Sequence, residues 1–336
     1  MEANIWMDNF ENLFIGAYAT SPTLFKWDED KEIEYFSNIK NSLKLKGLEI
    51  PFWGKLHEYD EELFLSLLDS KWKYILTSLP GTVKRLESNL HFGIASDDEK
   101  GRSEAIEFYK KANGVIKKIN DYFGTQKVIS MVLASAPSLK SDKTSSSSKS
   151  LIKSLNEITK WDWFGTKLVI EHCDSGREIN PVKGFLSLDE EIEAISEVNK
   201  TIRNPIGLTI NWGRSAIEMR SANGPVEHVR KAFQNNILSG LMFSGTSPKS
   251  DLYGEWSDLH LPIAKESGLK YYEVDSIMNL DNIKNTLNEC NLSLLSYIGV
   301  KVLSMPIENS TIEKRIGINR DTLKVLNQVI KQSYEY

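Results

Sequence analysis

The sequence predicts a single (β/α)8 barrel domain over residues 1–336, an α/β fold of the TIM-barrel type, and three observations support this prediction. Short apolar runs rich in β-branched residues alternate with amphipathic helical stretches along the chain. These runs are continuously apolar, which is typical of parallel strands buried on both faces. Eight such runs fit a barrel of this length. The alternative is a doubly wound open sheet, but no glycine-rich phosphate loop follows the first predicted strand.

Each element is predicted from its local pattern. The predicted strands lie at 12–18, 47–52, 74–78, 127–135, 167–172, 207–211, 240–243 and 300–305. The predicted helices include 102–122, 150–159, 188–199, 226–235 and 311–334. In the first of these helices Ile106, Tyr109, Ala112 and Ile116 recur at helical spacing and form one apolar stripe. The helix at 188–199 begins with acidic residues, which the helix dipole favours in a first turn.

Residues 139–150 follow the fourth predicted strand and are rich in serine and lysine, which is typical of a flexible loop. Active sites of barrels lie on the side where such loops emerge. The segment is therefore either a lid over the site or an ordinary surface loop.

Composition excludes several classes of protein. The net charge is −5 and charges of both signs are interspersed, so no basic surface for nucleic acid is expected. No apolar stretch approaches the roughly 18 residues of a membrane span, and the N-terminus lacks the plan of a signal peptide. Two cysteines, Cys173 and Cys290, make no disulfide framework and indicate a reducing compartment. We expect a soluble, cytoplasmic protein, and self-association into a homo-oligomer is left open.

Polar clusters end three consecutive predicted strands. The clusters are Glu171-His172-Cys173-Asp174, Asn211-Trp212-Gly213-Arg214 and Ser244-Gly245-Thr246. Residues just beyond the carboxyl ends of barrel strands face the active site. The sequence therefore predicts one shared pocket.

Three residues are the predicted catalytic groups: Glu171, Asp174 and His260. Glu171 ends the fifth strand, where an acid can act as a general base, ligate a metal or bind a sugar hydroxyl; the alternative is a buried salt bridge. Asp174 lies just past the strand as a second acid. His260, after the seventh strand, is either an acid–base partner or a surface histidine.

Eight further residues are predicted to bind substrate. They are Glu49, His172, Lys183, Asn211, Trp212, Arg214, Ser244 and Thr246. The rigid fork of Arg214 suits a carboxylate, phosphate or sulfonate, unless Arg214 pairs with Glu218. Trp212 either stacks on a sugar ring or packs between strand and helix. Neighbouring residues of a strand point to opposite faces, and we expect Glu171 rather than His172 to face the lumen.

No cofactor is predicted. The chain has no His-x-x-x-His pair and no cysteine cluster, so a divalent metal site would have to be assembled from separate strands. Lys301 is placed early in the eighth predicted strand, where a Schiff-base role is geometrically unfavourable. Cys173 stands beside an acid that opposes thiolate formation, so we expect a packed thiol.

These motifs resemble an uncharacterised bacterial family known only as a domain of unknown function. Besides the first two clusters above, the matching stretches include Trp161-Asp162-Trp163, Lys183-Gly184-Phe185-Leu186, Met242-Phe243-Ser244-Gly245, Asp258-Leu259-His260-Leu261-Pro262 and Glu49-Ile50-Pro51-Phe52. More remotely, the layout resembles the xylose-isomerase-like barrels, which include sugar isomerases, epimerases and a DNA-repair endonuclease. That resemblance implies a divalent metal held by acids and histidines that end strands five to eight. Glu171 and His260 match this pattern, but Asn211 stands where an acid is common and 300–306 offers no glutamate.

We therefore expect a carbohydrate-active isomerase, epimerase or lyase that acts on a small anionic sugar. Glu171 would be the base and His260 or Asp174 its partner. The alternatives are a glycoside hydrolase that uses two carboxylates from Glu49, Glu171 and Asp174, and a non-catalytic sugar-binding barrel. The expected partner is a small sugar or sugar acid, with no nucleic acid and no membrane.

Overall fold

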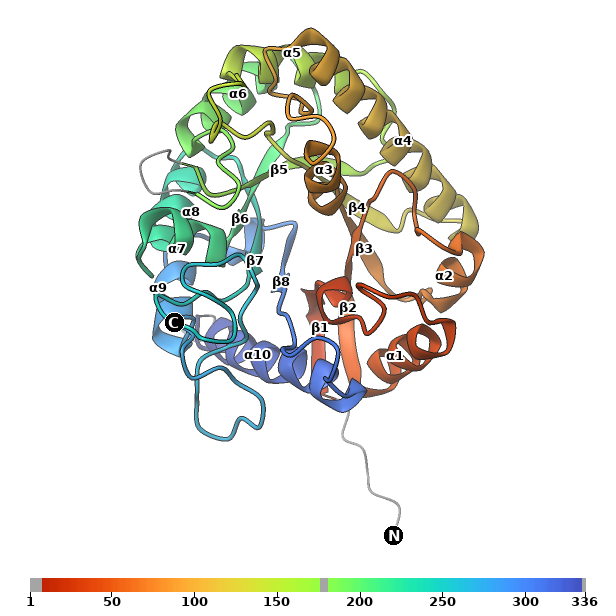
Figure 1. The fold of residues 1–336 in the computed structure, drawn as a ribbon, viewed down its shortest axis with the longest axis vertical. Coiled ribbons are helices and arrows are strands. Elements are labelled where there is room, and N and C mark those ends of the chain that lie inside the picture. Colours follow the sequence, from red (N-terminus) through yellow and green to blue (C-terminus); the bar gives the residue numbers. More distant parts are fainter. Residues whose placement is uncertain (1–7, 176–180, 334–336) are drawn as a thin grey trace.

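The protein forms a closed barrel of eight parallel strands surrounded by helices (Figure 1), as the sequence predicts. We describe a computed structural model, for residues 8–175 and 181–333. The strands pair in chain order, and β8 closes the barrel on β1. They are β1 (Asp8–Ile15), β2 (Leu43–Pro51), β3 (Lys73–Thr77), β4 (Val128–Leu133), β5 (Lys167–His172), β6 (Gly207–Asn211), β7 (Leu238–Phe243) and β8 (Tyr297–Val300).

The helices lie outside the strands and cover their outer faces (Figure 1). They are α1 (Glu29–Ser42), α2 (Glu61–Leu67), α3 (Leu79–Leu86), α4 (Glu99–Phe123), α5 (Ser148–Ile158), α6 (Leu188–Asn199), α7 (Trp212–Met219), α8 (Gly224–Gln234), α9 (Leu280–Leu287) and α10 (Ile312–Ser333), with short 3₁₀ helices η1 (Ala17–Thr20) and η3 (Leu292–Leu294). Local sequence sets their ends: α6 begins with a capping box between Ser187 and Glu190, and α4 ends at Gly124 with a φ of +66°. No helix in the described part of the chain is long and apolar enough to cross a membrane.

The barrel interior is sealed by a small apolar layer. Its buried members are Phe14, Ile75, Val132, Val169, Met242 and Tyr297, each from a different strand. Side chains two residues apart on a strand share a face, so Glu171 stands one layer above Val169 in the same lumen. The larger core fills the space between the strands and the helices. The polar ends of the strands therefore lie above a buried apolar layer.

Two predicted strand boundaries are wrong in ways that affect the site. The predicted strand 12–18 ends too late, because β1 stops at Ile15 and Tyr18 lies in η1. The predicted strand 300–305 begins too late, because β8 covers Tyr297–Val300. Lys301 therefore follows the strand directly and lies at its carboxyl end, whereas the sequence placed it early in the strand.

The loop 139–150 is tied down at its C-terminal part. The hydroxyls of Ser145, Ser147 and Ser150 all donate to the carboxylate of Asp97, at 2.5–2.6 Å, and α5 already begins at Ser148. These hydrogen bonds lower the pKa of Asp97, although its partial burial opposes this. A lid function for the segment stays a prediction.

Candidate active site in the barrel mouth

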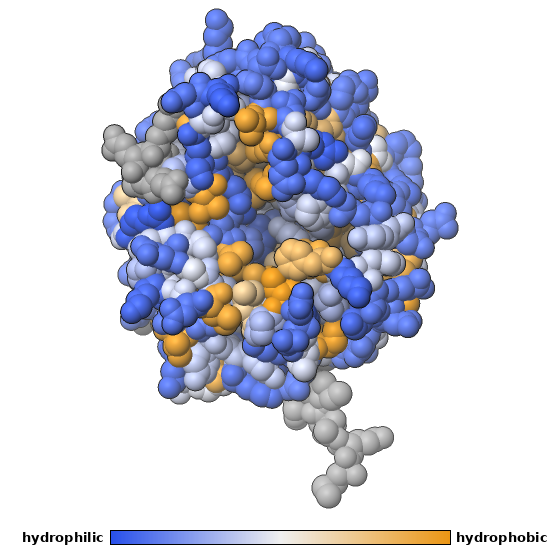
Figure 2. Space-filling view, in the orientation of Figure 1, coloured by the Kyte–Doolittle hydropathy of each residue, from blue (hydrophilic) through white to orange (hydrophobic). Residues whose placement is uncertain are grey.

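Charged side chains converge where the carboxyl ends of the strands meet. Figure 2 shows the barrel along its axis, with a hollow near the centre and hydrophilic residues in its depth. Glu49 comes from the end of β2, Glu171 from the end of β5, Lys301 from the residue after β8, and Arg214 from the first turn of α7. All four are at least 98% buried. With Asp258, from the long segment after β7, they are called the lumen cluster below.

Lys301 joins the two glutamates. Its Nζ lies 3.1 Å from Oε2 of Glu49 and 3.5 Å from Oε1 of Glu171. Oε1 of Glu171 also accepts hydrogen bonds from Nη1 of Arg214 at 2.6 Å and from Nδ2 of Asn211 at 3.1 Å. The other oxygen, Oε2 of Glu171, is buried and has no hydrogen-bond partner within 8–175 and 181–333. One oxygen is thus held by donors, while the other is buried without a partner among the described residues.

The surroundings move the pKa values of the two glutamates in opposite directions. Burial raises the pKa of Glu49, and the nearby carboxylate of Glu171 adds to this, although Lys301 opposes both. Burial would also raise the pKa of Glu171, but Arg214 and Lys301 together hold it below its usual value. Burial favours the neutral amine of Lys301, yet Glu171 and Glu49 outweigh it and raise the pKa of Lys301. The cluster therefore holds an ammonium, an ionised Glu171 and a Glu49 that protonates readily, which disfavours a Schiff base at Lys301.

Asp258 extends this network toward the surface and was not singled out from the sequence. Its Oδ2 lies 3.1 Å from Nε of Arg214 and 3.0 Å from Nζ of Lys183. Nδ1 of His260 lies 3.5 Å from Oδ1 of Asp258. Burial lowers the pKa of His260 to about 3 despite that carboxylate, so the imidazole is neutral at neutral pH. The structure thus brings His260 to the site as an uncharged group.

The remaining polar residues of the mouth hold its loops together. Oδ2 of Asp174 accepts hydrogen bonds from the backbone N–H of Val182 and, at 3.0 Å, of Lys183. Burial raises the pKa of Asp174, and Asp258 adds to this. The hydroxyl of Ser244 donates to Oδ1 of Asn211 at 2.7 Å, and the hydroxyl of Thr246 donates to the backbone carbonyl of Ser257 at 3.2 Å. An anion-binding role for Ser244 and Thr246 stays a prediction.

Comparison with known proteins places this barrel in a family. Residues 14–318 match the family described as Domain of unknown function (DUF4862). The chain belongs to this family. A relative, the uncharacterized protein STM3670 of Salmonella typhimurium strain LT2, is 33% identical over 326 residues, which cover 97% of this chain and all of that protein. The resemblance stated from the sequence motifs is confirmed.

Solved structures of the xylose-isomerase-like superfamily share the fold of this DUF4862 protein. They include an IolI protein with a bound zinc atom (15% identity, 95% of this chain and 99% of that one, TM-score 0.59). A D-allulose 3-epimerase from Methylomonas sp. is also similar, with 14% identity, coverage of 96% of this chain and 98% of that one, and a TM-score of 0.56. An L-ribulose 3-epimerase has 12% identity, coverage of 96% of this chain and 97% of that one, and a TM-score of 0.59. At these identities the likeness concerns the fold.

Two predicted substrate-binding residues of the DUF4862 chain point away from the lumen. His172 follows Glu171 in the extended strand and therefore faces the helices, where Nδ1 lies 2.7 Å from Oε2 of Glu191 and Nε2 lies 3.0 Å from Oε2 of Glu218. Burial would lower the pKa of His172, but the two carboxylates raise it to about 10. The indole of Trp212 is buried in the outer core, and its Nε1 donates to Thr286 of α9 at 3.0 Å. Trp212 therefore packs between strand and helix, which is the second of the two environments expected for it.

Arg214 also has other partners than the sequence suggested. The alternative considered for it was a pair with Glu218, but that carboxylate binds His172 and Ser175. Arg214 instead bridges the carboxylates of Glu171 and Asp258. Its proposed contact with an anionic ligand stays a prediction.

Within the described residues, one group outside the lumen has the ligand types of a metal site. Ligand atoms of His172, Glu218 and His228, the helix-side cluster, lie within 4.8 Å of one another. The second ring nitrogen of each histidine is held, in His172 by Glu191 and in His228 by the hydroxyl of Ser215 at 2.9 Å. Such outer hydrogen bonds orient histidine ligands. This cluster has the ligand types of a transition-metal site behind the barrel wall, and a metal there would have to displace the proton that Nε2 of His172 shares with Glu218.

The lumen does not fit the divalent metal of the related barrels. The ammonium of Lys301 already lies between Glu49 and Glu171, and the neighbour of Glu171 on β6 is the neutral amide of Asn211, which offers no further charge. A second, divalent cation between the same carboxylates would be repelled by that ammonium. No step below is routed through a metal.

Proposed function

We propose that this protein is a sugar epimerase or isomerase that moves a proton at a carbon next to a ketose carbonyl. The observation that carries the proposal is the pair of glutamates beside Lys301, whose pKa values are shifted apart. Such a pair suits an acid and a base in one site. The sugar 3-epimerases among the structures with this fold support a ketose substrate.

The steps follow from the protonation states. Oε2 of Glu171, which has no partner in the described chain, takes the proton from the carbon next to the carbonyl. The electron pair of the C–H bond moves to the carbonyl oxygen and gives an enolate. The ammonium of Lys301 stabilises this negative charge, because it is fully buried and held in place by the two glutamates. A protonated Glu49 returns a proton to the same carbon from the other face, which inverts it. For isomerisation the hydroxyl proton of that carbon must in addition pass to the former carbonyl oxygen, and Glu49 then protonates the former carbonyl carbon.

An anionic group on the sugar would bind near Lys183. Its side chain is 18% exposed, whereas the side chain of Arg214 is 2% exposed and already bridges two carboxylates. A carboxylate or phosphate of the substrate can therefore approach Lys183 from the solvent side. His260 and Asp174, the partners first expected for Glu171, border this part of the mouth.

The experiment is solvent exchange. The purified protein is incubated in D₂O with D-fructose, D-allulose, D-tagatose, L-ribulose and D-xylulose, and loss of individual C–H signals is followed by NMR. We expect exchange in at least one ketose, and a loss of 100-fold or more in Glu171→Gln. In Glu49→Gln exchange should persist, because Glu171 still abstracts the proton, but the epimer or isomer should no longer accumulate.

The matched control is Glu107→Gln, on the exposed face of α4, which should behave as the wild type. Absence of exchange in all five ketoses, or an unchanged rate in Glu171→Gln, would refute the proposal. Glycoside hydrolysis is the second candidate, because a carboxylate pair with separated pKa values also suits that reaction. Release of 4-nitrophenol from aryl glycosides, lost in the same two variants, would identify it.

A further inference from the structure

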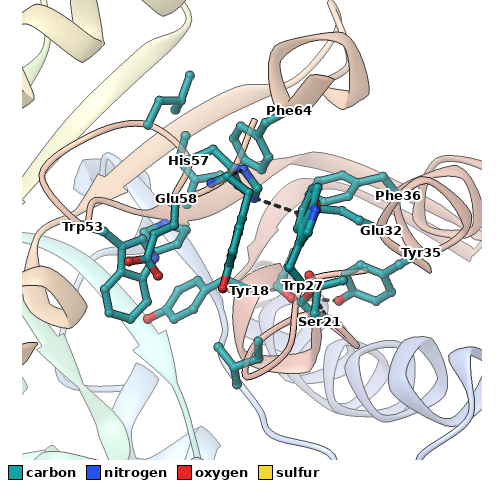
Figure 3. A pocket seen from close by; sticks show the side chains of 17 residues that line it. Tyr18, Ser21, Trp27, Glu32, Tyr35, Phe36, Trp53, His57, Glu58 and Phe64 are labelled. Carbon is teal, nitrogen blue, oxygen red and sulfur yellow. Dashed lines mark hydrogen bonds and ion pairs between the residues drawn. The ribbon is translucent and has the colours of Figure 1, made fainter. Parts of the chain in front are cut away.

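An aromatic pocket lies beside the lumen cluster, at the carboxyl ends of β1 and β2 (Figure 3). Its volume is about 90 Å³. A cavity needs roughly 10–15 Å³ to hold one water, so this space admits a group of several heavy atoms. The pocket is formed by the segments that follow β1 and β2, together with α1 and the start of α2.

Aromatic rings form its walls. Trp27 and Tyr59 stack with ring centroids 4.9 Å apart and an angle of 12°, and His57 stacks on Phe64 at 5.1 Å and 10°. Tyr59 is 61% exposed and lies at the rim. Flat apolar faces of this kind bind ligands that present a flat apolar face of their own.

A single buried carboxylate gives the pocket its polarity. Glu32 of α1 is 4% exposed, and its Oε1 lies 3.4 Å from Nε2 of His57. Nδ1 of His57 accepts hydrogen bonds from the backbone N–H of Tyr59 at 3.3 Å and of Asp60 at 3.0 Å. The proton of the neutral ring is therefore on Nε2, the ring nitrogen that lies nearest to Glu32. Oε2 of Glu32 has no hydrogen-bond partner in the described parts of the chain, and an unpaired buried acceptor is costly.

A sugar ring has both features that these walls require. Its C–H bonds form an apolar face that stacks on tryptophan and tyrosine, and its hydroxyls are donors for the free oxygen of Glu32. An apolar ligand would leave that oxygen unpaired. The chemistry of the pocket thus favours a polyhydroxylated ring.

Tyr18 connects this pocket with the proposed reaction centre. It lines the pocket, and its ring centroid lies 5.9 Å from Nζ of Lys301. We infer that the pocket binds a second sugar ring, so that the substrate is a glycosylated ketose whose reacting unit lies in the lumen. This substrate class rests on the function proposed above, whereas binding of a ring in the pocket can be tested independently.

The test uses methyl β-D-glucopyranoside, methyl β-D-galactopyranoside and methyl β-D-xylopyranoside as probes, followed by saturation-transfer NMR. At least one should bind the full-length wild-type protein in the millimolar range. Binding should weaken tenfold or more in Trp27→Ala and Glu32→Gln, and it should be unchanged in Glu171→Gln. Tyr59→Ala changes an exposed rim residue and should weaken binding without loss of folding, which circular dichroism and Tm verify for every variant.

Each outcome decides between the claims. No binding of any glycoside, or equal binding in the wild type, Trp27→Ala and Glu32→Gln, overturns the sugar pocket. Binding of choline without binding of the glycosides overturns it in favour of a cation site. Glycoside binding without deuterium exchange in any ketose leaves the pocket in place and refutes the proposed function alone. If the protein shows both glycoside binding and ketose exchange, we expect exchange in at least one glycosylated ketose: lactulose, maltulose, turanose or isomaltulose. Its kcat/KM should be at least tenfold above that of D-fructose, and Trp27→Ala should remove this difference. Equal kcat/KM values for the glycosylated ketoses and D-fructose would overturn the substrate class.

Discussion

Replacing Lys301 with methionine tests the electrostatic core of the site. The side chain is fully buried and its ammonium is the common partner of Glu49 and Glu171. Methionine fills a similar volume but leaves two buried carboxylates facing each other. Removing one partner of a buried ion pair costs about 3–5 kcal/mol, a large part of the 5–15 kcal/mol that holds a typical domain folded. We expect Lys301→Met to lower the free energy of unfolding by about this amount at pH 8.

The loss should depend on pH in a defined direction. Without the ammonium, the folded-state pKa of Glu49 rises further above the value of about 4.3 in an unfolded chain. Between these two values the folded state binds more protons than the unfolded state, so stability rises as the pH falls. One proton contributes about 1.4 kcal/mol per pH unit across that window. Lys301→Met should therefore regain part of its lost stability between pH 8 and pH 5.

The free energy of unfolding of Lys301→Met and of the wild type is measured by urea unfolding, followed by tryptophan fluorescence, at pH 5, 6, 7 and 8. The control is Lys117→Met, because the pair of Lys117 with Asp121 on α4 is more than half exposed on both sides; it should unfold like the wild type at each pH. If Lys301→Met were as stable as the wild type at pH 8, or if its midpoint followed pH like the wild type, the assigned ion pairs would be wrong.

Three further predictions concern the reaction and metals. In the proposed function, formation of the epimer or isomer by the wild type should fall at high pH as Glu49 ionises, whereas deuterium exchange, which needs only Glu171, should not; NMR of both across the pH range checks this. Arg214→Lys cannot bridge Glu171 and Asp258 with a fork; the pKa of Glu171 should rise, and the acid limb of the profile should move to higher pH. Deuterium exchange, measured by NMR, should survive removal of metal. Added Zn²⁺ should raise Tm, measured by calorimetry, through the helix-side cluster. His228→Gln should abolish that rise in Tm and leave exchange intact.

The fold and half of the site could be predicted because they depend on local periodicity. Continuous apolar runs predicted the barrel. The alternation of side chains along β5 predicted that Glu171 faces the lumen and His172 faces the helices, as the structure has them. The three polar strand ends do meet in one mouth. Trp212 was left between two environments, since an aromatic residue at the start of a helix suits a sugar face and a core equally.

The rest of the site depends on contacts that no local pattern reveals. Lys301 was predicted to lie early in a strand because β8 is short and the residues that follow Val300 are as apolar as a strand. Asp258 reaches the lumen through an irregular segment in which His260 has a φ of +51°. Glu32 looks like an ordinary surface acid of an amphipathic helix, and only the fold of the loop after β2 brings His57 over it. Long-range pairs of this kind follow from loop conformation, which sequence periodicity does not specify.

The charges in the barrel mouth explain why a proton, and not a metal, is the natural mobile cation there. Glu49, Glu171, Asp174 and Asp258 face Lys183, Arg214 and Lys301, so four acids meet three fixed cations. One bound proton makes this set of seven side chains neutral. Burial raises the pKa of Glu49 and Asp174, so these two carboxylates are the groups that bind the proton. A divalent ion would leave an excess of positive charge among buried side chains, which is unfavourable. A proton held on Glu49 instead sits beside the ionised Glu171, and in the proposed reaction its transfer between these two through the sugar would leave the total charge unchanged.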